Sequence, residues 1–329
     1  MTNNKIQRSH ITSQHGFSLL ELLVAVAILV IVSAVVMEGL AKMSLANSTI
    51  TNRTQMHSGV RSATEVLQQE IGQAGKIDLP TDGVTLTGGV NVPAGTTVTA
   101  TLGVSSAAGM FLNEKLVIDA GASQETVTLT AVNLGANQIT AAFTVTHAAG
   151  AAIRAAGGFA NGVIPTNATN GSSATVLKLF GDINDDGNMV YIEYTCNTGT
   201  GKLYRNVMSV SATGKPAVTD SLVLLPNIQT NPGGTPCFTY QEKTVPTVSG
   251  MTYVLNVAVT LTVRTEQKDL DTNQYQTETK ALLNVSPRNV YEAWLLRSGN
   301  FTDRVQSTPA NVTCLVSATA GATGACPGS

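Results

Sequence analysis

A short acidic segment in the second half of the chain has the spacing of a calcium-binding loop. Asp182, Asn184 and Asp186 stand at alternate positions, Gly187 follows them, and Glu193 comes six residues after the glycine. Alternation directs side-chain oxygens inward, glycine allows a sharp bend, and oxygen atoms are the ligands that Ca²⁺ prefers. The residues after the loop predict a strand where an EF-hand has a helix. A polar β-turn closed by Asp-Gly is therefore the alternative interpretation.

The chain has four cysteines, Cys196, Cys237, Cys314 and Cys326. An even number of cysteines favours disulfide bonds if the chain is exported, and four cysteines allow three pairings. We favour Cys196–Cys237 and Cys314–Cys326, because the second bond would hold a Gly-, Ala- and Thr-rich end that has little else to fold on. A zinc site is the weaker alternative, since the spacings are not those of zinc knuckles and no histidine is near.

Catalytic residues are not indicated. Of the four histidines, His10 and His15 lie near the amino terminus, His57 lies in a helical pattern and His147 lies in a strand-rich segment. No nucleophile or carboxylate pair is placed near His57 or His147, and no glycine loop for phosphate is present. Charged residues are 12% of the chain, the net charge is −2 and no basic run occurs. We therefore expect neither an enzyme nor a nucleic-acid-binding protein.

An apolar run extends from Phe17 to Met37, and Glu21 is its only charged residue. This run is expected to be the element that positions the amino terminus. As a helix at about 1.5 Å per residue it is long enough to cross a bilayer core of about 30 Å. A carboxylate in lipid is costly and normally has a functional partner. The leader before the run carries Lys5 and Arg8 and no acid, which places the amino terminus in the cytoplasm. An ordinary signal anchor is the alternative, although ordinary signals end at a small-residue cleavage site.

The residues Gly16-Phe17-Ser18-Leu19-Leu20-Glu21 resemble the class III signal of type IV prepilins and type II pseudopilins. In that family a prepilin peptidase cuts after the glycine, here Gly16, which makes residues 1–16 a leader peptide. The new amino-terminal residue, here Phe17, is then N-methylated. The fifth mature residue, here Glu21, neutralises the amino terminus of a neighbouring subunit during assembly. Pairing offsets the cost of burying either charge alone.

After Met37 the pattern stays helical and becomes amphipathic until Gly75 and Pro80 end it. The sequence predicts one helix from about Phe17 to Lys76, with residues 17–37 in the membrane and residues 38–77 packed on a head. The apolar stripe comprises Leu40, Met43, Ile50, Val60, Ala63, Leu67, Ile71 and Ala74.

The rest of the chain predicts an α+β fold in which an antiparallel sheet packs on this helix. Residues 78–156 form an inserted β module, residues 157–300 the sheet of the head, and residues 301–329 a tail that disulfide bonds pin. The strands expected in the module are Val84–Leu86, Thr96–Thr101, Lys115–Ile118, Glu125–Val132 and Gln138–Thr140, and those expected in the head are Thr175–Phe180, Met189–Cys196, Lys202–Val207, Val218–Leu225, Val254–Arg264 and Glu278–Val285.

The order of motifs along the chain looks like that of the PilW-like minor pilins, which are relatives of the J-type minor pseudopilins. The motifs are Leu67–Gly75, Glu193-Tyr194, Leu203-Tyr204-Arg205 and Ser286–Val290. This resemblance implies the type IV pilin fold, but residues 81–156 and those after Asn300 fall outside it. The module itself resembles small β modules of bacterial surface and phage proteins, which implies no particular function.

We therefore expect a minor pilin of a type IV pilus. It would stay in the inner membrane until it joins a tip complex that primes polymerisation. Its expected partners are other major and minor pilins, the prepilin peptidase, the assembly platform of the inner membrane and membrane lipid. Two alternatives stay open: a minor pseudopilin of a type II secretion system, and a tip adhesin that binds through residues 81–156. Calcium is the only cofactor that the sequence suggests.

Overall fold

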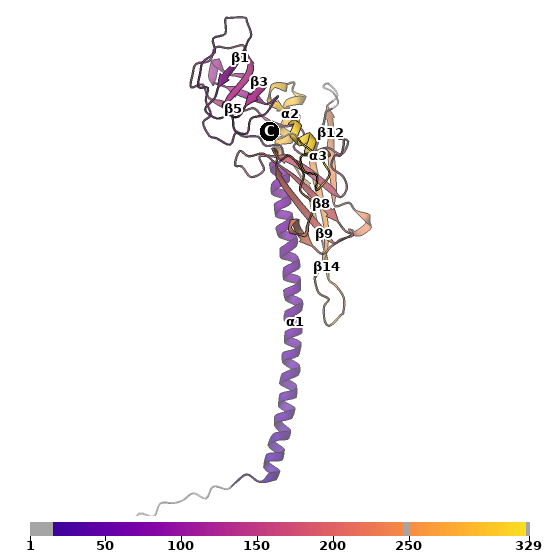
Figure 1. Ribbon diagram of the computed structural model, residues 1–329. Helices are drawn as coiled ribbons and strands as arrows, with labels where there is room; N and C mark the ends of the chain where they lie inside the picture. Colours follow the sequence, from indigo (N-terminus) through magenta and orange to yellow (C-terminus); the bar gives the residue numbers. More distant parts are fainter. Residues whose placement is uncertain (1–15, 246–250, 327–329) are drawn as a thin grey trace, which may run out of the picture.

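The computed structural model describes residues 16–245 and 251–326, and it consists of one long helix with an elongated head at its far end (Figure 1). The arrangement is α+β, as the sequence predicts: helix α1 is followed by antiparallel sheets. The leader, apart from Gly16, lies outside the described residues.

Helix α1 spans Leu19–Gln73 without interruption. The chain turns away from the helix at Gly75. The φ of this residue, +81°, lies in the left-handed region that glycine adopts without strain. The backbone of Gly162 crosses this point so closely that a Cβ on Gly162 would lie 2.2 Å from the Cα of Gly75. Glycine at both positions therefore lets the head close directly over the end of the helix.

Only the last part of α1 packs on the head. All residues from 16 to 44 are exposed, and the buried residues of the helix begin at Met56. The prediction that the packed stripe begins at Leu40 is therefore wrong for its first members, since Leu40 is 56% and Met43 is 72% exposed. These residues stay exposed because the head does not extend far enough along the helix to cover them.

The loop that follows strand β13 is the part of the head that runs along the helix towards the amino terminus (Figure 1). It contacts α1 at Thr49, whose hydroxyl donates to Asp269 over 3.2 Å. Residues before Leu45 have no part of the described head beside them, so the apolar residues there stay uncovered.

Two four-stranded antiparallel sheets form the head. The first has the order β10-β9-β8-β7, and in the second β13 is flanked by β14 on one side and by β11 and β12 on the other. The strands are β7 Val176–Gly181, β8 Val190–Asn197, β9 Lys202–Ser209, β10 Val223–Pro226, β11 Ile228–Gln229, β12 Phe238–Val245, β13 Met251–Arg264 and β14 Thr277–Val285.

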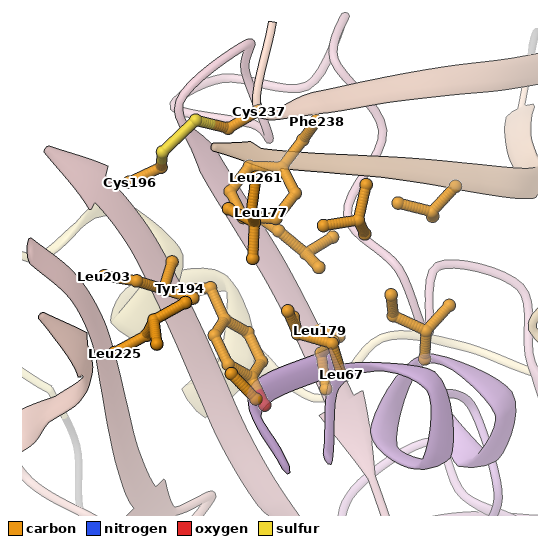
Figure 2. Close-up of a cluster of buried hydrophobic side chains, with 14 of the residues drawn as sticks. Leu67, Leu177, Leu179, Tyr194, Cys196, Leu203, Leu225, Cys237, Phe238 and Leu261 are labelled. Carbon is orange, nitrogen blue, oxygen red and sulfur yellow. A yellow bond between two sulfur atoms is a disulfide. The ribbon is translucent and has the colours of Figure 1, made fainter. Parts of the chain in front are cut away.

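The main core lies between α1 and these two sheets. Leu67 of α1 packs against alternate residues of β7 and β8, among them Leu177, Leu179 and Tyr194, while Phe238 and Leu261 approach from the second sheet (Figure 2). Alternation along β7 and β8 is what presents these residues to the helix on one face. The other face of the same sheet is covered differently.

The segment after Asn300 covers that second face, and the prediction of a tail with little structure is wrong. It contains a 3₁₀ turn, Thr302–Arg304, strand β15, Val305–Gln306, and helix α3, Ala310–Ser317. Val312 and Leu315 of α3 are fully buried, in one cluster with Phe180, Tyr191 and Met208 of the first sheet. Two apolar residues one turn apart on so short a helix are enough to bury it, although they give little periodicity.

Residues 79–155 form a separate five-stranded sheet with its own hydrophobic cluster. Its order is β1-β4-β3-β2-β5, with β1 Val98–Gly103, β2 Lys115–Ile118, β3 Glu125–Asn133, β4 Gln138–Phe143 and β5 Ile153–Ala155. Gln306 of β15 joins this module to the head. Its buried amide donates to the carbonyl oxygens of Lys115 and Ala156 over 2.7 and 2.8 Å and accepts from the Lys115 N–H over 2.9 Å.

Several elements were not expected from the sequence. They are β5, β11 and β12, the short strand β6, Gly158–Phe159, together with β15, with which it pairs in parallel, and the helices α2, Arg288–Ser298, and α3. The strand expected over Val218–Leu225 begins only at Val223, because a 3₁₀ turn occupies Asp220–Leu222.

Leu67→Ala should lower the free energy of unfolding by about 2–5 kcal/mol, because it leaves a cavity in the main core. Leu40→Ala, on the uncovered part of the same helix, is the matched control and should change it by less than about 0.5 kcal/mol. Urea unfolding of the full chain in detergent, followed by the fluorescence of the single tryptophan, Trp294, measures both. Equal effects of the two variants would contradict this assignment of the core.

Candidate functional site

The amino-terminal motif is presented at the free end of α1, far from the head (Figure 1). Gly16 has no atom within 4 Å of the position that a Cβ would take, and Phe17 is 86% exposed. The bond between these two residues is therefore free of contacts with the rest of the described chain. A peptidase can reach it without unfolding any element.

Glu21 takes part in a capping box at the start of the helix. The Glu21 N–H donates to the Ser18 hydroxyl over 3.2 Å, and the Ser18 N–H donates to the Glu21 carboxylate over 3.1 Å. Such reciprocal bonds satisfy two of the N–H groups that the first turn leaves unpaired. Glu21 thus has a local role that the sequence analysis missed, although Ser-x-x-Glu before an apolar run is its known signature.

The apolar segment that follows is fully exposed. Among the described residues α1 is the one helix long and apolar enough to cross a membrane, with a mean hydropathy of 3.0 over its best 18 residues, none of them buried. A surface of this kind is not stable in water, since an uncovered apolar stripe needs lipid or other helices around it.

Comparison with known proteins gives one match. Residues 11–37 match the family described as Prokaryotic N-terminal methylation motif. The amino terminus is that of a type IV pilin-like prepilin. No curated protein and no solved structure matches the chain.

The motif accounts for the exposed Gly16–Phe17 bond and for the exposed apolar helix that follows it. It implies processing by a prepilin peptidase and pilin partners in general. The exposed apolar helix fits anchoring in a membrane followed by assembly with other helices. The amino-terminal motif also suggests a structural rather than an enzymatic protein.

A partly buried ion pair fixes the head on the helix at the opposite end of α1. The carboxylate of Glu70 accepts three bonds from the Arg205 side chain, two from Nε over 3.0 and 3.2 Å and one from a terminal nitrogen, and a further bond from the Tyr194 hydroxyl. Burial raises the pKa of Tyr194, and the neighbouring Glu70 carboxylate raises it further, so the hydroxyl keeps the proton that it donates. Removing Arg205 would leave the buried Glu70 carboxylate without its cation, which is strongly destabilising.

The four residues of the expected calcium site are not brought together. Asp182 is fully buried, and its carboxylate accepts from the Asp186 N–H over 2.9 Å and lies 3.2 Å from the ammonium of Lys76, which also contacts Asp185. The hydrogen bond to Asp185 raises the pKa of Lys76 above its usual value, and the bond to Asp182 makes a smaller contribution in the same direction. A lysine cation thus stands beside the carboxylates of this turn.

Glu193 lies elsewhere, on β8 opposite Lys178 of β7. Its carboxylate contacts Lys215 and Tyr191 rather than Asp182. In residues 16–245 and 251–326, no group of three or more His, Cys, Asp and Glu side chains is arranged to hold a metal ion. The four residues are therefore not assembled into a calcium site in this structure, and the segment forms the polar turn between β7 and β8.

The structure contains the two disulfide bonds that the sequence analysis favoured. Cys196–Cys237 joins the first sheet to the residue before β12 in the second, with the Cα atoms 6.4 Å apart (Figure 2). Cys314–Cys326 joins α3 to the end of the described chain, with the Cα atoms 5.6 Å apart. One bond therefore links the two sheets, and the other closes the segment that covers the first sheet.

The module buries two unusual ionisable groups. The side chain of His147 is fully buried, with Nε2 2.8 Å from the Glu125 carboxylate and Nδ1 3.4 Å from that of Asp119. Glu114 is also fully buried, its Oε2 accepts from the Phe111 N–H over 3.1 Å, and Oε1 has no partner in the described structure. Burial raises the pKa of Glu114 to about 8.

Glu114 should make the module less stable as the pH rises. Its folded pKa of about 8 lies above the ordinary value of 4.5, so the folded state binds the proton more tightly than the unfolded state. Stability is then highest below about pH 4.5 and falls as the pH rises towards 8. Glu114→Gln should raise the melting temperature at pH 8 and change it little at pH 5.

Thermal unfolding of the full chain at both pH values measures this effect. Glu292→Gln, which changes an exposed glutamate, is the control and should have no effect at either pH. A change of equal size at pH 5 and pH 8 for Glu114→Gln would show that packing, not protonation, is responsible.

Proposed function

We propose that this protein is a PilW-like minor pilin of a type IV pilus. After cleavage behind Gly16 it would wait in the inner membrane and then join a tip complex that primes polymerisation. One observation carries the proposal: a prepilin-type amino terminus stands on a helix that stays exposed through residue 44. In a filament, the apolar stripes of neighbouring pilin helices would cover this surface.

Glu21 is the residue that we propose couples the subunits. Its carboxylate accepts from Ser18 N–H through one oxygen and remains exposed, and a carboxylate has lone pairs for further donors. The amine that cleavage creates on the Phe17 of a neighbouring subunit is a suitable donor. Two opposite charges in an apolar environment then offset much of each other's desolvation cost.

Glu21→Ala and Glu21→Gln separate this charge pairing from helix capping. Glutamine still forms a capping box but carries no charge, whereas alanine loses both functions. We expect both variants to be processed normally and both to be strongly depleted from sheared pili. Processing is measured from the mass of the membrane-extracted chain, and incorporation from the amount of this subunit in the pilus fraction. Incorporation of Glu21→Gln at the wild-type level would assign the glutamate to capping alone.

A second candidate function is that of a tip adhesin. The observation in its favour is that the module has its own sheet and core and lies at the end of the molecule away from the amino terminus of α1 (Figure 1). In a subunit anchored by α1, this end would project from the filament. Deleting residues 81–156 would then abolish surface attachment and leave the filaments intact.

A strain that lacks the gene tests the assembly role against its closest alternative. Surface pili and secreted proteins are quantified in parallel and compared with a strain in which the gene is restored. We expect the pili to be lost and secretion to be unchanged. Loss of secretion with intact pili would assign the protein to a type II secretion system as a minor pseudopilin.

A further inference from the structure

A row of polar side chains crosses the first sheet on the face opposite α1. Lys178 of β7 pairs with Glu193 of β8, and Glu193 pairs with Asn206 of β9, so the three side chains point to the same face. Lys178 is 8% and Asn206 is 3% exposed. Such a row is unexpected in the interior, because buried lysine, glutamate and asparagine each need partners.

A second lysine lies on top of this row. Lys215, in the loop after β9, is 3% exposed, and its Nζ is 2.8 Å from the Glu193 carboxylate and 5.5 Å from the centre of the Tyr191 ring. The Asn206 side-chain amide donates to the carbonyl oxygen of the next residue, Pro216, over 3.2 Å. The loop therefore holds the Lys215 amine beside the Glu193 carboxylate. The carboxamide of Asn206 lies against the same loop.

Two features of this cluster call for an explanation. Lys178 and Lys215 place two amines beside one carboxylate, so the buried site has an excess of positive charge if both are protonated. The Oδ1 atom of Asn206 is buried and has no hydrogen-bond partner in the described structure. An unpaired buried carbonyl oxygen is costly.

The two lysines differ in their other contacts. Lys178 donates to the carbonyl oxygens of Asn170 over 2.8 Å and of Val316, in the last turn of α3, over 3.1 Å. These bonds hold its amine away from reaction and suit the carbonyl end of a helix. Lys215 has Glu193 as the single hydrogen-bond partner of its amine among the described residues.

We propose that Lys215 and Asn206 form an intramolecular isopeptide bond, with Glu193 as the proton acceptor. Glu193 takes a proton from the Lys215 ammonium, and the free amine attacks Cγ of Asn206. The new Nζ–Cγ bond forms, the Cγ–Nδ2 bond breaks, and the nitrogen leaves as ammonia. One ammonium, one carboxamide and one carboxylate thus become a secondary amide, ammonia and a carboxylic acid, with no oxidant or reductant needed.

The product gives the Asn206 oxygen a partner and replaces the buried Lys215–Glu193 ion pair by neutral groups. The Lys215 charge disappears, which leaves Lys178 with its two carbonyl partners. The protonated Glu193 is a donor for the amide oxygen, and its other oxygen can accept from the new N–H. Exclusion of water by the surrounding aromatic and aliphatic side chains favours the neutral product over the ion pair.

The bond would hold the carboxy-terminal cover on the sheet. The Lys215 N–H donates to the Ala322 carbonyl over 3.1 Å, and the Gly321 N–H donates to the Lys215 carbonyl over 2.8 Å. Joining Lys215 to β9 therefore fixes this covering segment in a way that reduction of Cys314–Cys326 does not undo. A covalent link of this kind would suit a subunit exposed to force and proteases outside the cell.

Cyanogen bromide cleavage of the full-length protein tests the proposal directly. Cleavage after Met189, Met208 and Met251 puts Asn206 in fragment 190–208 and Lys215 in fragment 209–251. Cysteines are first reduced and alkylated, because Cys196–Cys237 joins the same two fragments. We expect the two fragments to remain joined, with a mass lower by one ammonia, about 17 Da, than the sum of the separate fragments.

Variants assign the reaction to its residues. Lys215→Gln and Glu193→Gln should each release separate fragments, while Lys178→Gln, which also removes a buried amine of the cluster, should retain the link. Two separate fragments from the wild-type protein would overturn the proposal whatever the variants do. Fragment 111–189 joined to 190–208 would also overturn it, since that product would place the link on Lys178.

Discussion

Helix α1 is 55 residues long, yet its hydrogen bonds to the head begin at Thr49 and its buried residues begin at Met56. Everything that positions the free end of the helix must therefore act over this short contact. The apolar part of it is supplied by Met56, Val60, Ala63, Leu67 and Ile71. The pair of Glu70 with Arg205 fixes the rotation and register of the helix on the first sheet. Hydrophobic burial alone is non-directional, so this ion pair, with its buried Glu70 carboxylate, is what can give the contact a unique geometry.

This contact uses one face of the first sheet, and the other face also has to be buried. The carboxy-terminal segment does this with α3 and the cluster around Phe180 and Tyr191. A sheet covered on both faces explains why its strands read as apolar with isolated polar residues rather than as clean alternation. It also explains why a charged row such as Lys178 and Glu193 becomes buried when the last segment closes over it.

The sequence predicted the elements whose patterns are local and missed those that depend on tertiary contacts. The long helix and strands β2, β3, β7, β8 and β9 were expected within a few residues, since periodicity and β-branched residues define them. Helix α3 was missed because three buried residues, Val312, Leu315 and Val316, give too short a periodic signal. The loop from Asp182 has the residue types of a calcium site, but Lys76, which lies 106 residues earlier in the chain, occupies its neighbourhood. No pattern within one segment could indicate that neighbour.

The amino-terminal motif was predictable for the opposite reason, because it works without the head. Among the described residues nothing packs on Gly16, Phe17 is exposed, and Glu21 bonds within its own first turn. The local properties of these residues can therefore be read directly from adjacent residues. The Cys314–Cys326 disulfide and the proposed Lys215 bond depend instead on tertiary contacts. Cys314 and Cys326 close a segment whose burial depends on α3, and Lys215 reaches Glu193 only because that same segment pairs with its loop. If the chain assembles as we propose, the end that joins the filament is specified locally, whereas the exposed end is specified by closure of the whole head.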